Sequence, residues 1–243
     1  MREARLLLVR TRSGKTHGLR ARFYVWSGES PPDPSLAEKS EAVREVIHPL
    51  IDFVWDDSPL DGVPAGNFMV EWTGYIDVPE TGVYRIYVIV DDGVKVWVDE
   101  KLVIDAWMDQ PPTQYVSEPL VLERGFHKVR ILYYNNDVFG RMLLGWMTPE
   151  GYVGVIPPDR LYTKLSEYIE VKGLPPGYRV ELRNGFLVKS GVSKFGIARI
   201  DVRDLDEPIP AYFRVYDTEG RIVLETPVIS DVWGGDEYIT LAK

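Results

Sequence analysis

The stretch Tyr84–Trp107 constrains the fold of this chain more than any other part of the sequence. The stretches Tyr84–Val90 (YRIYVIV) and Val94–Val98 (VKVWV) have the alternating pattern of strands, with Arg85 and Lys95 each between apolar residues, and a third short run, Leu102–Asp105, follows a turn. Alternation with a period of two is typical of a half-buried β-strand. The stretch therefore predicts three consecutive strands in an all-β fold.

Two adjacent carboxylates, Asp91 and Asp92, follow the first of these strands and precede Gly93. Neighbouring negative charges repel each other, and a hard cation such as calcium, which takes about six to eight oxygen ligands, would make their proximity favourable. The alternative is a polar Asp-Asp-Gly turn that binds nothing, and these residues taken alone favour it.

The composition narrows the classes of function. The 243 residues are 45% hydrophobic and 27% charged, which is typical of a globular protein with a packed core. The net charge is −9 and no basic run is interleaved with aromatic residues, so a nucleic-acid partner is not expected. Because the chain has no cysteine, disulfides, thiolate metal sites and cysteine nucleophiles are excluded.

Further motifs surround the Asp-Asp pair in a consistent order. Tyr84 and Tyr87 precede the pair, Val94–Val98 follows it, and Asp105-Ala106-Trp107 ends the stretch. Four further motifs lie before and after this stretch in the chain: Gly18–Tyr24, Phe53–Trp55, Gly66–Ile76 and Ile156–Tyr162. Together these motifs resemble the PA-fourteen domain, the lectin-like β-sandwich family named after the anthrax protective antigen and related to the yeast flocculin adhesins. The resemblance covers Gly18 to about Thr163 and implies a PA-fourteen-like β-sandwich.

The resemblance also implies a calcium site. In the sugar-binding flocculins the Asp-Asp pair is joined by a cis peptide bond and supplies carboxylates, while a later loop supplies an Asn side chain and two backbone carbonyls. The matching positions are Asp91 and Asp92 for the carboxylates, Asn135 for the side chain, and Asp137 and Phe139 for the carbonyls. A vicinal diol of a sugar would complete the calcium shell. The residues expected to contact the sugar are Asp91, Trp107, Tyr134, Asn136 and Phe139. A calcium ion that only ties the two loops together is the alternative.

Two local predictions lie within the same region. Asp99-Glu100-Lys101 stands where the family usually has glycine in a turn, and Glu adopts positive φ reluctantly, so a wider hairpin is expected. Ser35 and Glu38 form a capping-box pattern before helix-like apolar spacing, which predicts a short surface helix over about Ser35–Val46.

The sequence predicts three segments: residues 1–17 as an N-terminal strand or extension, 18–164 as the PA-fourteen-like domain, and 165–243 as a small antiparallel β-sandwich. Within the first segment, the apolar run Leu6–Val9 is too short for a secretory signal or a membrane span. We expect this run either to be buried against the C-terminal domain or to pair with a neighbouring subunit through its free edge.

No stretch of the sequence contains a recognisable catalytic motif. His17, His48 and His127 fit no metal or triad spacing, and no nucleophile elbow or phosphate loop is present, so we expect no enzyme activity. The sequence favours a calcium-dependent carbohydrate-binding or adhesion module, extracellular or surface-exposed, with a cell-surface glycan as partner. The alternative is a structural or decorating subunit of a surface layer, appendage or virion that self-associates and binds no glycan.

Overall fold

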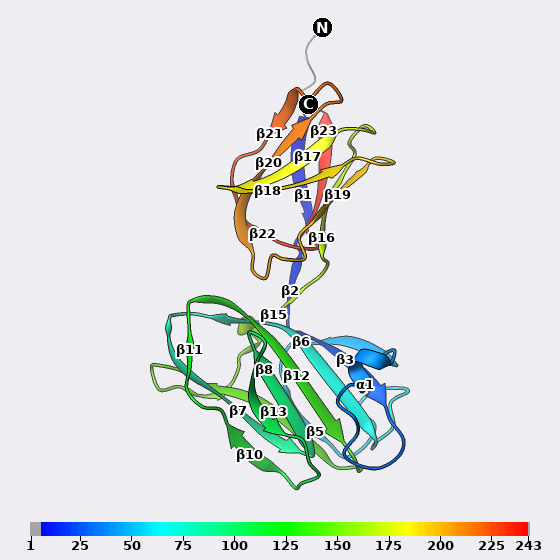
Figure 1. Ribbon diagram of the computed structural model, residues 1–243, viewed down its shortest axis with the longest axis vertical. Helices are drawn as coiled ribbons and strands as arrows, with labels where there is room; N and C mark the ends of the chain where they lie inside the picture. Colours follow the sequence, from blue (N-terminus) through cyan, green and yellow to red (C-terminus); the bar gives the residue numbers. More distant parts are fainter. Residues whose placement is uncertain (1–5, 243) are drawn as a thin grey trace. The chain divides into compact units, whose positions relative to one another are not determined.

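The structure is a computed structural model that describes residues 6–242, and the chain divides into two compact units (Figure 1). One unit is His17–Thr163, and the other combines the described residues of Met1–Thr16 and Lys164–Lys243. Almost all regular structure is β-strand, which confirms the expected all-β class.

Two sheets build the first unit. One sheet has the order β10 (Thr113–Val116), β7 (Gly82–Asp91), β13 (Gly140–Met147) and β14 (Val153–Val155); β11 (Leu120–Leu122) also pairs with β7, and β5 (Asp52–Trp55) pairs with β13. The other has the order β2 (Lys15–His17), β15 (Leu161–Lys164), β6 (Phe68–Val78), β12 (Gly125–Asn135), β8 (Gly93–Val98) and β9 (Lys101–Ala106); β3 (Leu19–Val25) pairs with β6, and β4 (Arg44–His48) pairs with β3. The three strands predicted within Tyr84–Trp107 are β7, β8 and β9.

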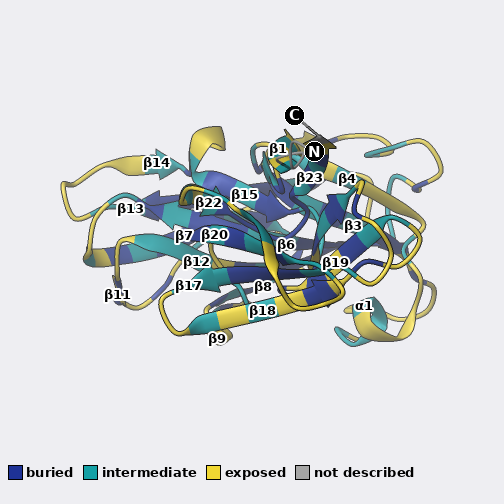
Figure 2. Cartoon of the chain, turned by 90° about the horizontal axis from the view of Figure 1, so that it is seen from above, coloured by how far each residue is buried: buried dark blue, intermediate teal, exposed yellow. Residues whose placement is uncertain are grey.

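The core of this unit follows from the alternation along its strands. Apolar residues on one face of each of the two sheets form one large buried cluster that includes Trp72, Tyr84 and Tyr133. Figure 2 shows buried strands beside exposed loops. A second cluster, which includes Met69 and Tyr134, is built from side chains of the opposite face of β6 and β12. Both faces of these central strands are therefore apolar near the end that carries Asn135.

The turn between β8 and β9 is tighter than predicted. Val98 faces Lys101 across a two-residue loop in which Asp99 and Glu100 both have positive φ, 47° and 67°. Contacts to β12 hold this conformation, because the Asp99 carboxylate accepts the Lys128 N–H at 3.0 Å and its own N–H donates to the Lys128 carbonyl at 2.9 Å. The expectation of a wider hairpin is therefore wrong.

The predicted helix over Ser35–Val46 is also wrong in most of its length. The helix α1 covers only Leu36–Lys39, and the Ser35 hydroxyl makes no capping bond. A short 3₁₀ turn, η1 (Pro158–Arg160), lies in a later part of the chain. The later part of the predicted helix belongs to β4, which pairs with β3 from Leu19 opposite His48 onward. β-Branched residues such as Val46 and Ile47 favour a strand when a sheet edge is available.

The second unit is a small sandwich of two sheets. One has the order β1 (Leu6–Arg12), β23 (Glu237–Ala242), β16 (Tyr168–Lys172) and β19 (Ile197–Asp201). The other has the order β18 (Leu187–Val192), β17 (Arg179–Asn184), β20 (Ile209–Tyr216) and β21 (Ile222–Glu225), with β22 (Ile229–Val232) pairing with β20. The strand β22 was not predicted from the sequence.

The N-terminal strand β1 is part of this second unit instead of a separate extension. It pairs antiparallel with β23, from Leu6 opposite Ala242 to Val9 opposite Ile239, and Leu8 packs against the core of the unit. Its Arg10 forms ion pairs with Asp231 and with the fully buried Asp236. Of the two arrangements considered for Leu6–Val9, packing against the C-terminal domain is the one observed.

Candidate metal and carbohydrate site

The topology brings the two predicted halves of the site together at one end of the first unit. Tyr134 on β12 faces Gly93 on β8, and the next residue, Asn135, faces Phe68 on β6. The Asp-Asp pair immediately precedes Gly93, so it lies beside the loop that follows Asn135. Gly93 is required here, because a Cβ atom at this position would stand 2.1 Å from the Tyr134 ring.

Asp92 links the loops on either side of it. Its Oδ2 accepts the Asn136 N–H at 2.8 Å and its Oδ1 accepts the Gln110 N–H at 3.2 Å. Burial raises the pKa of this carboxyl, as do Asp109 and Asp137, although the two backbone hydrogen bonds oppose the change. The peptide bond between Asp91 and Asp92 is cis, as the resemblance implies.

Asp91 carries the clearest electrostatic signature of the pair. Burial, the neighbouring Asp92 and the nearby Asp137 raise its pKa to about 6. Arg141, which faces Asp91 in the strand register, forms its ion pair with Asp52 at 2.7 Å instead. Within the described part of the chain no cation pairs with Asp91 or Asp92, so no opposite charge offsets the repulsion between these carboxylates.

Asn135 is a fully buried polar side chain that uses only half of its hydrogen-bonding capacity. Its Nδ2 donates to the carbonyl oxygens of Asp137 and, at 3.3 Å, of Ala65. Its Oδ1 is buried without a hydrogen-bond partner among residues 6–242. Buried polar atoms are satisfied in the great majority of cases, so an acceptor left over beside two carboxylates fits a bound cation.

Glycines allow the backbone to close around this amide. A Cβ atom on Gly140 would stand 2.9 Å from the Asn135 Oδ1, and one on Gly66 would stand 2.8 Å from the Asp137 carbonyl oxygen. Larger residues at either position would push the loop away from Asn135.

The donor set suits calcium better than a transition metal. No group of three or more His, Cys, Asp or Glu side chains gathers to hold a metal ion anywhere in the described residues. A cation at Asp91 and Asp92 would therefore depend on amide and carbonyl oxygens as well, which are ligands that Ca²⁺ accepts readily. Asn135, Asp137 and Phe139 lie on the loop that could supply them.

The structure corrects one of the residues expected to contact a sugar. Tyr134 is 0% exposed, its hydroxyl donates to Asp109 at 2.8 Å, and its ring meets Trp107 edge-on at 4.7 Å between centroids. An aromatic ring that is already packed in this way offers no face for stacking. Sequence reasoning missed this because a strand whose two faces are both buried reads as a simple apolar run.

The remaining sugar-contact candidates differ in accessibility. Phe139 is 46% exposed, and Asn136 is partly exposed. Trp107 is partly buried, with its indole N–H donating to the Pro32 carbonyl at 2.9 Å. Phe139 is therefore the aromatic residue of the predicted set with the most free surface.

Gln110 is a residue of the site that sequence reasoning did not find. Besides its backbone contact to Asp92, its side-chain Nε2 donates to the Asp92 carbonyl at 2.9 Å, and its Oε1 accepts the Tyr115 hydroxyl at 2.6 Å. No motif or spacing marks a glutamine for this role, because the loop approaches Asp92 only in the folded chain.

The three histidines take part in separate interactions. His17 packs against the Tyr162 ring, His48 accepts the Trp72 indole N–H at 3.0 Å, and His127 contacts Asp99 at 2.6 Å. The absence of enzyme activity stays an expectation. Over residues 6–242, no helix has the length and apolar character needed to cross a membrane.

Comparison with known sequences places most of the first unit in one family. The sequence model of the PA14 domain matches residues 15–159, which is more than half of the chain. This chain belongs to the PA14 domain family. PA14 is the same family as the PA-fourteen family that the sequence motifs resemble. The unit His17–Thr163 is called the PA14 unit from here on.

Proteins similar to this chain include anti-sigma factors and an adhesin domain. The anti-sigma-I factor RsgI3 of Acetivibrio thermocellus is 32% identical over 153 residues, which is 62% of this chain but only 22% of that protein. A solved anti-sigma factor domain-containing protein has a TM-score of 0.53 at 18% identity, covering 90% of this chain and 99% of the other. The PA14 sugar-binding domain from an RTX adhesin has a TM-score of 0.54 at 16% identity, covering 60% and 98%. At these identities the two structural matches establish the fold.

Proposed function

We propose that the PA14 unit is a calcium-dependent carbohydrate-binding module. Asp91 and Asp92 would supply carboxylate oxygens, Asn135 its Oδ1, and Asp137 and Phe139 their carbonyl oxygens. The single observation that carries the proposal is the buried Asn135 Oδ1, which has no partner among the described residues, near two carboxylates that pair with no cation there.

The bound cation would supply the positive charge that holds two adjacent sugar hydroxyls. Calcium takes about six to eight oxygen ligands, so five from the chain would leave a few positions for water or for a diol. The protein's own contribution is to hold its oxygens in place before binding, which it does through the bonds that Asn136 and Gln110 make to Asp92. Phe139 and Asn136 would contact the sugar at the open side of the site.

The relatives support carbohydrate as the ligand and a surface location for the module. The adhesin domain with this fold is described as sugar-binding, and adhesins act at surfaces. The matches to anti-sigma factors favour a second candidate, in which the module is the ligand-binding part of a signalling protein. Labelling of intact and of permeabilised cells with an antibody to the chain would test the surface location, since only a surface-exposed module is labelled on intact cells.

Calorimetric titration with calcium tests the metal site. We expect the wild type to bind calcium and Asn135→Leu, which removes the unpartnered oxygen at similar volume, to bind at least about tenfold more weakly. Asp92→Ala should abolish binding. Asp56→Asn, an exposed carboxylate outside the site, is the control and should titrate like the wild type.

A glycan array with and without a chelator tests the carbohydrate. A glycan signal that disappears with the chelator and in Asn135→Leu supports the proposal. Calcium binding without any glycan signal would make the ion a clamp between loops, and the absence of calcium binding would contradict the assignment of all five ligands.

A further inference from the structure

A hollow of about 280 Å³ lies on the PA14 unit where β8 turns into β9 beside β12. Four side chains line it: Trp97, Glu100, Lys128 and Arg130. The Asp-Asp pair precedes the first residue of β8 and this hollow lies at its last residues, so the two places are at opposite ends of one strand. The volume is just below the range of about 300–1,000 Å³ that is usual for ligand sites, and suits a group of about one ring.

Glu100 occupies a turn position that suits a different residue. Its φ is 67°, and Asn or Gly is favoured at such a position of a two-residue hairpin. The turn itself is held by Asp99, whose carboxylate accepts the Lys128 N–H and contacts the His127 ring. The Glu100 side chain is 82% exposed and pairs with the Lys128 Nζ at 3.5 Å, a contact worth about 1 kcal/mol or less. Residues held in unfavourable backbone regions cluster at functional sites, so we ask what this carboxylate binds.

Trp97 gives the hollow an aromatic wall. It is partly exposed, and it packs in part against the cluster that includes Met69 and Tyr134. The Arg130 guanidinium lies 5.0 Å from the centre of its ring. An indole held between neighbours in this way is a fixed apolar surface with hydrogen-bonding groups around it. Such a surface suits a sugar ring, whose C–H face packs on an aromatic ring while its hydroxyls reach the polar groups.

The charges around the hollow favour a neutral ligand. Lys128 pairs with Glu100, and Arg130 pairs with Glu71 at 2.8 Å and Glu38 at 3.4 Å. Both cations of the lining therefore already have carboxylate partners, so an anionic ligand would have to compete for them. A hydroxyl group both donates and accepts hydrogen bonds, and the lining offers an acceptor as well as donors.

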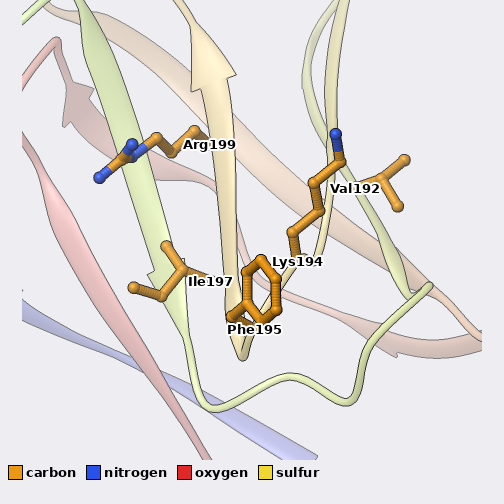
Figure 3. A pocket seen from close by; sticks show the side chains of 5 residues that line it. All are labelled: Val192, Lys194, Phe195, Ile197 and Arg199. Atoms are coloured by element: carbon orange, nitrogen blue, oxygen red, sulfur yellow. The ribbon is translucent and has the colours of Figure 1, made fainter.

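A second hollow, in the other unit, lacks this combination. Figure 3 shows its lining, which is Val192, Lys194, Phe195, Ile197 and Arg199. Its polar side chains are both cationic, so it offers hydroxyl groups no side-chain acceptor. Phe195 nevertheless resembles Glu100 in one respect, because it is an exposed turn residue with positive φ, 52°. It therefore provides a matched control.

We propose that the hollow at Trp97 is a second carbohydrate site, which binds one neutral sugar ring without calcium. The ring packs on Trp97, the Glu100 carboxylate accepts hydrogen bonds from its hydroxyls, and Lys128 and Arg130 donate to them. None of these residues belongs to the proposed calcium ligands, so this site does not depend on the calcium site.

An array of neutral oligosaccharides, probed in excess chelator, tests the site while the calcium site is disabled. Signals that the chelator removes belong to the calcium site, and we expect others to survive both the chelator and Asp92→Ala. The surviving signals should fall at least about tenfold in Glu100→Gly and in Trp97→Leu. Phe195→Gly, which also removes a side chain from a positive-φ turn position beside a hollow, should bind like the wild type.

The thermal stability of Glu100→Gly separates binding from folding. Glycine adopts positive φ without strain, so the melting temperature of the PA14 unit should stay the same or rise while binding is lost. A lower melting temperature would show that Glu100 supports the turn, and would overturn the proposal. No neutral glycan bound in chelator, binding of charged glycans alone, binding retained in Glu100→Gly, or an equal loss in Phe195→Gly would also overturn it.

Discussion

Asn135 and Asp92 are the residues on which the candidate calcium site depends, and both are polar groups removed from water by the fold. Asp92 is 8% exposed and satisfied by backbone N–H groups from two loops, whereas the Asn135 Oδ1 is left without a partner. A buried acceptor without a partner costs roughly 1–3 kcal/mol. Binding of a cation would remove that cost.

His48 gives a prediction at the same scale that does not involve the calcium site. Burial lowers its pKa to about 4, and its Nδ1 accepts a hydrogen bond from Trp72, which requires the neutral ring. Between pH 6.5 and about 4 the unfolded chain therefore binds a proton at this position that the native chain does not. The free energy of unfolding should fall as the pH falls through this window, by at most about 1.4 kcal/mol per pH unit.

Urea unfolding of the wild type and of His48→Gln across this pH range measures the effect. The raised pKa of Asp91 acts in the opposite direction over an overlapping range, so the difference between the two proteins isolates His48. His17→Gln serves as the control. Parallel profiles for the wild type and His48→Gln would contradict the assignment.

At the scale of elements, β1 shows how a strand from one end of the chain completes a sheet at the other end. Its backbone pairs with β23, and its Arg10 reaches Asp236, whose carboxylate also accepts the Trp233 N–H and the Tyr238 hydroxyl, each at 3.1 Å. Asp236 is 0% exposed, so its charge depends on Arg10 and on these donors.

Asp236→Ala should therefore be strongly destabilising. Its removal leaves the buried Trp233 N–H and Tyr238 hydroxyl without this acceptor and leaves Arg10 with Asp231 alone, and each buried donor left unsatisfied costs about 1–3 kcal/mol. Asp231→Ala removes the more exposed partner of Arg10 and should cost about 1 kcal/mol or less. Chemical unfolding compares the two, and limited trypsin digestion at Arg10 and Arg12 should be faster in Asp236→Ala alone. Similar stabilities for both variants would mean that the buried carboxylate does not hold β1.

At the scale of the whole molecule, the two units have separate cores and the proposed calcium ligands all lie in one of them. A ligand that binds only the native state stabilises the unit that contains its site. Calorimetry should therefore show calcium raising the melting temperature of the PA14 unit and leaving the transition of the second unit unchanged.

Deletion of residues 1–13 is the complementary test, because this segment contains β1 and ends before β2, which pairs with β15 in a sheet of the PA14 unit. It should lower the melting temperature of the second unit alone, while calcium still raises that of the PA14 unit. A single transition that responds as a whole to both changes would show that the units unfold together.

The sequence by itself determined what depends on neighbouring residues. The period-two alternation over Tyr84–Val90 and Val94–Val98 predicted β7 and β8, because a strand places successive side chains on opposite faces whatever surrounds it. The contiguous motifs around Asp91 and Asp92 identified the PA14 family, and the resemblance to that family implied the cis peptide bond between them.

Only the tertiary structure decided what depends on contacts between distant segments. Val46 and Ile47 form a strand because the edge of β3 is available, Tyr134 is buried because both faces of β12 are covered, and β1 pairs with β23, more than 200 positions away in the chain. Gln110 reaches Asp92 only after the loop folds over it. These outcomes are free-energy differences between competing partners, and a local pattern contains no information about which partners the rest of the chain will provide.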